Sequence, residues 1–287
     1  KIKILSPKFG YSKAEYFMSK ETNSIYKGIG SIKYLNENVA NELYDLSQHK
    51  TYTNFFDLLQ DIKEFTSCDS RLDILIKLNF FDCFGASEKL LKIVEIYNAI
   101  YSKQQFKKEK LPEFLTIDLL RKYANIETEK MFKDVDKANL IKELITQLPN
   151  KEIPIAETLK AHKEYLGYID YTNTKLNKRY VLITDTDTKY TPKIDTYCLQ
   201  NSKTCQCKIQ KQLFKQKPLR PNNIIYINSM QSKYGCKKVG EKKDAKGKLK
   251  PIFEEDKSTT VWWINDYTII NNFDEVLEEL NEEMSNR

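Results

Sequence analysis

Asp185 and Asp187 form the one pair of side chains whose types and spacing suggest catalysis. They stand as Asp-x-Asp at the end of a predicted strand, an arrangement that can hold two Mg²⁺ ions for nucleotidyl transfer. No third carboxylate and no glycine-rich loop accompany the pair, which favours a simple turn between strands. We therefore predict no catalytic residue in the chain.

The cysteines offer a second chemistry, a zinc site. Four of the six lie in the C-terminal half, at Cys198, Cys205, Cys207 and Cys236. Cys-x-Cys places both thiols on one face of a strand, and no Cys-x-x-Cys pair is present, so we predict no metal site and no bound cofactor. Six cysteines beside lysine-rich surfaces are typical of a reducing cytoplasm rather than of a disulfide framework.

Backbone groups supply a clearer candidate site. The stretch Lys27 to Leu43, KGIGSIKYLNENVANEL, predicts a helix over GIGSIKYL, a tight turn and a second helix. SRLDILIKL, the turn residue Asn79 and a helix at Ser87 repeat the arrangement. Tandem helix-hairpin-helix units hold DNA phosphates with outward N–H groups and helix N-termini. An ordinary corner of a helical bundle is the alternative.

The turn of such a hairpin needs a residue with positive φ, normally glycine. Asn36, Asn38 and Asn79 stand at the expected positions, and asparagine tolerates this conformation better than most other residues. The residues predicted to contact DNA at the two hairpins are Lys33, Leu35, Asn36, Glu37, Asn38, Lys77 and Asn79.

A basic region follows where the hydrophobic pattern changes from helical spacing to strand alternation. Five blocks between residues 179 and 270 predict a five-stranded barrel of the oligonucleotide-binding type. Residues 201–250 contain fourteen Lys and Arg against two acids, which is typical of a phosphate-backbone binder. A solvated lysine-rich surface is the alternative explanation of this charge.

Single strands bind such barrels by base stacking and through a basic groove. The predicted contacts are Lys189, Tyr190, Tyr197, Lys208, Lys211, Lys215, Arg220, Tyr226 and Trp263. Of the adjacent Trp262 and Trp263, one is expected to point into the core and the other outward, because strand side chains alternate.

The predicted fold is therefore multidomain α+β. A short β segment covers residues 1–30, a mostly helical domain covers 31–168 with a polar connector at 102–138, the barrel covers 179–270, and a C-terminal helix covers 271–287. No apolar run approaches the roughly 18 residues that a membrane span needs.

The order of these blocks resembles the late fingers and clamp-binding region of bacterial C-family replicative DNA polymerases, the DNA polymerase III alpha subunits. The matching blocks are ILSPKFGYSKAEYF, SIYKGIGSIKYLNENVANEL, FFDLLQDI, SRLDILIKLNFFDCFG and HKEYLGYI. Tyr34, Asn36 and Asn38 stand where the family's first hairpin is usually glycine-rich. The family's palm carboxylates and N-terminal PHP domain lie upstream of this region.

The resemblance implies a non-catalytic segment of a DNA-directed DNA polymerase, with Mg²⁺ in the active site of the parent enzyme. It implies double- and single-stranded DNA as partners, in a bacterial or viral replisome in the cytoplasm. It also implies a sliding-clamp contact at Met131 and Phe132, although these residues lack the family's preceding glutamine and could simply pack on a helix. A stand-alone nucleic-acid-binding module and a protein-interaction scaffold are the alternative functions.

Overall fold

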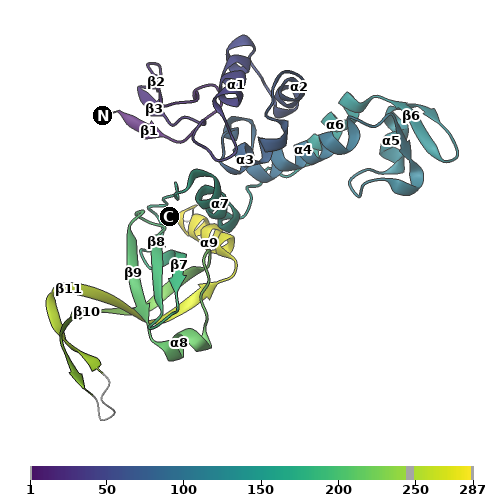
Figure 1. Cartoon of the computed structure of the whole chain (residues 1–287). Helices are drawn as coiled ribbons and strands as arrows, with labels where there is room; N and C mark the ends of the chain where they lie inside the picture. Colours follow the sequence, from purple (N-terminus) through teal and green to yellow (C-terminus); the bar gives the residue numbers. More distant parts are fainter. Residues whose placement is uncertain (1, 244–248, 286–287) are drawn as a thin grey trace. The chain divides into compact units, whose positions relative to one another are not determined.

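The computed structural model describes residues 2–243 and 249–285. The chain forms two compact units, Lys1–Ile169 and Asp170–Arg287, and each is treated separately below (Figure 1). Both combine helices and strands, so the chain is multidomain α+β. Within the described residues, no helix is both long enough and apolar enough to cross a membrane.

The N-terminal unit begins with a small three-stranded sheet. It is built from β1 (Lys3–Leu5), β2 (Phe17–Ser19) and β3 (Ser24–Tyr26) in the order β1-β3-β2. The outer strands pair with β3 in opposite senses, β1 parallel and β2 antiparallel. The loop after β3 then leads into the helices of this unit.

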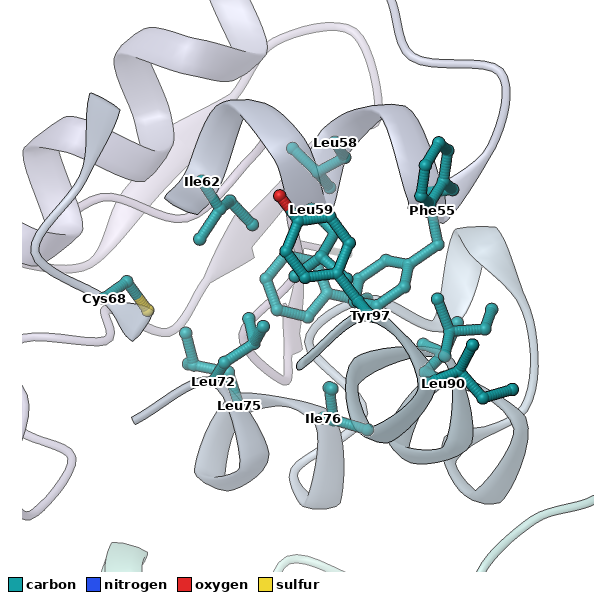
Figure 2. Packing of buried hydrophobic residues seen from close by; sticks show 14 of the residues in the cluster. Phe55, Leu58, Leu59, Ile62, Cys68, Leu72, Leu75, Ile76, Leu90 and Tyr97 are labelled. Carbon is teal, nitrogen blue, oxygen red and sulfur yellow. The ribbon is translucent and has the colours of Figure 1, made fainter. Parts of the chain in front are cut away.

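Four helices surround the main core of this unit. They are α1 (Glu37–His49), α2 (Phe55–Phe65), α3 (Leu72–Lys77) and α4 (Ser87–Ile100), with the short turns η1 (Asp69–Arg71) and η2 (Asp82–Phe84) on either side of α3. Figure 2 shows Leu58, Leu59 and Ile62 of α2 facing residues of α3 and α4. All three side chains are fully buried, as apolar spacing of three and four residues predicts.

Residues 102–138 are not the connector that their polarity suggested. They contain β4 (Gln105–Lys107), η3 (Lys108–Lys110), α5 (Ile117–Tyr123), β5 (Ala124–Glu127) and β6 (Met131–Val135), and the sheet order is β4-β6-β5. Phe106, Leu120 and Phe132 are each at most 2% exposed and join the main core. Because β4 and β6 each bury a single aromatic side chain, their sequences look mostly polar.

Three further helical segments complete the N-terminal unit. These are α6 (Lys137–Thr146), α7 (Ile155–Ala161) and the π-helical turn η4 (His162–Leu166), which ends at Gly167 in a left-handed conformation. The extended segment between α6 and α7 contacts the start of α4.

The C-terminal unit is a closed five-stranded barrel. Its strands are β7 (Tyr180–Asp187), β8 (Lys193–Cys198), β9 (Thr204–Ile209), β10 (Ile224–Lys243) and β11 (Leu249–Ile270), in the order β10-β11-β9-β8-β7. The ring closes through antiparallel pairing of β10 with β7, while β11 runs parallel to β9. Alternate side chains such as Ile183, Ile194 and Ile264 fill the interior.

Two helices belong to this unit. Helix α8 (Lys211–Gln216) connects β9 to β10, and α9 (Phe273–Ser285) follows β11. Much of the basic region of residues 201–250 is strand, since β10 alone covers Ile224–Lys243. In Figure 1, β10 and β11 continue past the barrel as a two-stranded arm, and their pairing runs out to Lys243 and Leu249.

Candidate nucleic-acid interface

The first hairpin is built around the close approach of Gly28 and Gly30 to a neighbouring segment. The amides of Ile29 and Gly30 donate to the carbonyls of Lys13 and Ala14 at 3.0 and 2.9 Å. A Cβ at Gly28 would lie 2.3 Å from the Ala14 carbonyl oxygen. Glycine is therefore required here for space, and neither Gly28 nor Gly30 has positive φ. The predicted helix over GIGSIKYL is wrong, because this stretch forms successive turns.

The asparagines of this hairpin do not occupy the predicted positions. Tyr34 takes the positive φ, 71°, whereas Asn36 is extended at φ −135° and caps α1, its Oδ1 accepting from the Val39 amide at 3.0 Å. Asn38 lies in the first helical turn. Asparagine is common both in turns and at helix N-caps, and Asn36 serves as the N-cap of the helix that follows.

The other predicted contacts of the first hairpin differ in accessibility. Lys33 is exposed, and its amide donates to the Tyr165 carbonyl at 2.9 Å. A hydrogen bond to Tyr34 raises the pKa of the Lys33 ammonium. Leu35 is only 8% exposed and belongs to the core. Glu37 is exposed beside Gly28 and Gly30 in one surface depression.

The second hairpin contains the positive φ that was predicted at Asn79, which has φ 57°. The Phe80 amide donates to the Leu75 carbonyl at 3.0 Å, and Phe80 and Phe81 are at most 1% exposed. Lys77 is held by two carboxylates, 3.5 Å from Glu157 and 3.8 Å from Asp73. This turn therefore directs its aromatic side chains into the core.

The start of α4, where a phosphate was expected to bind, is already occupied by the chain itself. The amides of Ala86 and Ser87 donate to Asn150 Oδ1 and Glu152 Oε2, both at 2.9 Å. The Glu88 amide donates to the Lys151 carbonyl at 3.1 Å. A carboxylate thus sits where an anion would bind, and the start of α4 presents no open phosphate site.

The outer face of the barrel brings together an aromatic ring and several lysines. Lys193 of β8 pairs with Lys208 of β9, which in turn pairs with Trp263 of β11. The Lys208 and Lys233 ammonium groups lie 5.7 and 5.3 Å from the centre of the Trp263 ring. Paired residues of neighbouring strands share a face, so this group forms one continuous surface, called the Trp263 face below.

The loop between β7 and β8 borders this face. Asp187 Oδ1 accepts from the Lys189 amide at 3.0 Å, and the Pro192 carbonyl accepts from the Ile209 amide at 3.0 Å. Tyr190 at the loop tip is 72% exposed. Asp187 therefore organises a turn, in agreement with the interpretation favoured for the Asp-x-Asp pair.

Other predicted barrel contacts lie elsewhere. Tyr197 is 6% exposed and its hydroxyl donates to the Tyr171 carbonyl, while Tyr226 packs at 4.9 Å against Tyr180. The remaining three, Lys211, Lys215 and Arg220, belong to α8 and the segment after it. The sequence did not predict Lys193 and Lys233 as contacts, because lysine is common throughout the chain. The pairing of neighbouring strands is what places both beside Lys208 and Trp263.

The two tryptophans follow the expected alternation, with one difference. Trp263 faces outward on the barrel, and Trp262 points to the opposite side of β11. Trp262 is nevertheless 40% exposed rather than buried. At this position β11 is leaving the barrel, so the inner side of the strand no longer has a core to cover it.

The remaining sequence candidates are also placed. Cys205 and Cys207 lie with their sulfurs 3.8 Å apart, but burial raises the pKa of the Cys207 thiol to about 12, which disfavours the thiolate that zinc requires. Within residues 2–243 and 249–285, no three His, Cys, Asp or Glu side chains are grouped as metal ligands. Phe132, half of the clamp-binding candidate, is fully buried, and its partner Met131 is partly buried.

Comparison with known proteins agrees with the hairpin part of this description. A family described as helix-hairpin-helix motif matches residues 1–91, which include both hairpins. No curated protein matches the chain. The N-terminal unit therefore contains a helix-hairpin-helix region of the nucleic-acid-binding kind, in which residues 150–152 occupy the start of the helix after the second hairpin.

Proposed function

We propose that this chain is a DNA-positioning segment of a C-family replicative DNA polymerase. In this proposal the first hairpin holds the backbone of duplex DNA, and the Trp263 face holds the template single strand. Nucleotidyl transfer with Mg²⁺ belongs to the palm of the parent polymerase, and the residues of this chain supply no step of it. A sliding clamp stays a predicted partner, but it would need an attachment point other than the buried Phe132.

The observation that carries the proposal is the pair of lysines at the Trp263 ring. A single strand is bound by stacking its bases on exposed aromatic rings while cations follow its phosphates. Trp263 supplies the ring, and Lys208 and Lys233 supply cations on two different strands. Lys193 extends the charge to a third strand.

The strand order also supports an oligonucleotide-binding barrel. Numbered from β7, the strands follow the order four, five, three, two, one, and a helix joins the third to the fourth. Barrels of this type bind along their second and third strands, between the loops that join strands one to two and four to five. Here those elements are β8, β9, the Tyr190 loop and the arm.

Binding of a labelled single strand, measured by fluorescence anisotropy over a range of salt concentrations, tests this proposal. We expect Trp263→Ala to weaken binding by roughly tenfold, as loss of one stacked base predicts, and Lys208→Ala to reduce the salt dependence. Lys215→Ala on α8 is the matched control and should have little effect. Binding that does not respond to salt would instead favour the protein-interaction scaffold.

The adjacent tryptophans allow a direct test of which face binds. Trp262→Phe leaves Trp263 as the only tryptophan, and Trp263→Phe leaves Trp262. Single-stranded DNA should quench the fluorescence of the Trp262→Phe variant more strongly than that of the Trp263→Phe variant. The reverse order would contradict binding at the Trp263 face.

The polymerase origin rests on the resemblance of residues 1–100 and is tested separately. The coding sequence upstream of Lys1 should encode a palm with its catalytic carboxylates. A start codon close to Lys1 with no palm sequence would instead favour the stand-alone nucleic-acid-binding module.

A further inference from the structure

Two lysine–tyrosine pairs stand beside the first hairpin. Lys33 Nζ lies 4.8 Å from the centre of the Tyr34 ring, and Lys27 Nζ lies 5.0 Å from that of Tyr168. Tyr34 and Tyr168 are 56% and 46% exposed as whole residues. Tyr165 lies against Tyr34, with ring centres 6.4 Å apart. These five residues are called the tyrosine patch below.

The patch joins two segments that are far apart in sequence. One is the loop that carries Gly28 and Gly30, and the other is η4 with the residues after it. The Lys33 amide donates to the Tyr165 carbonyl at 2.9 Å, which fixes one segment against the other. Both segments belong to the N-terminal unit, and the left-handed Gly167, with φ 78°, separates Tyr165 from Tyr168. The patch is therefore part of one folded unit.

Tyr34 is an unusual choice for its position. Its φ of 71° is strained for a bulky side chain and easy for glycine or asparagine. Burial of the side chain does not offset this backbone strain, because more than half of the Tyr34 surface is exposed. A side chain that strains the backbone and stays in solvent is better explained by binding than by folding.

We propose that the tyrosine patch stacks an unpaired nucleotide where single strand leaves the duplex held by the first hairpin. Open tyrosine rings offer faces to bases, and Lys27 and Lys33 are positioned for the flanking phosphates, the combination that binds single strands without sequence preference. The inference rests on the proposed function, since the hairpin would deliver the duplex end to the patch. It adds a single-strand contact separate from the barrel.

The test uses the full chain and a duplex with a single-stranded overhang, in which the first unpaired base is 2-aminopurine. Stacking quenches the fluorescence of this base, so the signal reports on one nucleotide. We expect quenching by the wild-type protein, loss of most of it in Tyr34→Asn, and partial loss in Tyr168→Ala. Tyr34→Asn should also keep or raise the unfolding midpoint, because asparagine tolerates positive φ.

A control variant separates the patch from other exposed rings. Tyr101→Asn removes another exposed tyrosine that lies near a lysine, Lys137, in the same unit. It should preserve the quenching. Wild-type protein that binds the DNA without quenching, or equal quenching by a folded Tyr34→Asn variant, would overturn this inference alone. Absence of any binding to the DNA by the wild-type protein would contradict the proposed function instead.

Discussion

The two hairpins of the N-terminal unit begin their following helices in different ways. Helix α1 is capped locally, because the Asn36 side chain accepts a hydrogen bond from the amide of Val39, three residues later. Helix α4 receives its acceptors from Asn150, Lys151 and Glu152, more than sixty residues further along the chain. The comparison teaches that the helix after such a hairpin can be capped by the local chain or closed by a distant segment. Residues 150–152 close the start of α4 and are called the seal below.

Gly28 of the first hairpin should be the most sensitive position. Replacing it with alanine places a Cβ 2.3 Å from the Ala14 carbonyl oxygen and 2.5 Å from the Glu15 carbonyl carbon, both backbone atoms that cannot rotate away. We expect a loss of roughly 3 kcal/mol or more of unfolding free energy, at the upper end of overpacking effects. Urea unfolding followed by the helical circular dichroism signal measures it. Gly240→Ala, whose Cβ would lie 4.0 Å from Ile252 Cδ1, is the control and should be nearly neutral.

Gly85 of the second hairpin should be sensitive for a different reason. Its backbone, at φ 142° and ψ 178°, lies in a region that essentially only glycine populates. An alanine Cβ there would lie 3.1 Å from Asn150 Oδ1, in the segment that seals the helix. Gly85→Ala should therefore cost about 2 kcal/mol by the same urea measurement. A neutral effect would mean that the seal and turn can rearrange together.

Glu152 tests whether the seal stabilises the fold and closes the second hairpin. Glu152→Ala removes the acceptor of the Ser87 amide and hydroxyl, and the loss of a helix cap predicts a cost of about 1.5 kcal/mol. Glu152→Gln keeps an acceptor oxygen and should cost less. Because this hairpin is closed, we expect Glu152→Ala not to lower affinity for duplex DNA. A weaker duplex complex of the folded variant would show that Glu152 supports binding.

The seal also marks the limit of what the sequence could predict. Amphipathic spacing predicted α2 and α4, and strand alternation predicted the five barrel strands, because burial of one face imposes those periods. The position of Asn150 and Glu152 against α4 depends on packing between distant segments. No local pattern around residues 150–152 reports it.

The candidate site was predicted with similar limits. Asn79 was correctly assigned positive φ, whereas Asn36 was not, because an asparagine before a helix can serve as a turn or as a cap. Trp263 and Lys208 were identified from composition on a basic barrel. Lys233 requires the register of β10 against β11 to be recognised. Type and spacing therefore identify candidates, and register decides which of them meet.

Substitution of Asn36 tests how much the stability of the first hairpin depends on its local cap. Asn36→Ala removes the acceptor of the Val39 amide and should cost about 1 kcal/mol. Asn36→Ser keeps a capping oxygen and should recover most of that loss. If Asn36→Ala cost more than Glu152→Ala in urea unfolding, the local cap would be the more important of the two.

Replacing Asn79 or Tyr34 should change stability least, and it compares the two hairpins most directly. Both have positive φ, but Asn79 lies in the sealed hairpin and Tyr34 in the open one. Replacement of either by glycine relieves a strained conformation at the cost of a more flexible unfolded chain, so each stability change should stay within about 1 kcal/mol. The binding effects should differ, because both residues are exposed but only Tyr34 carries a ring on which a base could stack. Asn79→Gly should leave the affinity for overhang DNA unchanged in anisotropy measurements, while Tyr34→Gly should lower it. Equal losses would mean that both hairpins contact DNA, and the seal over α4 would then have to open on binding.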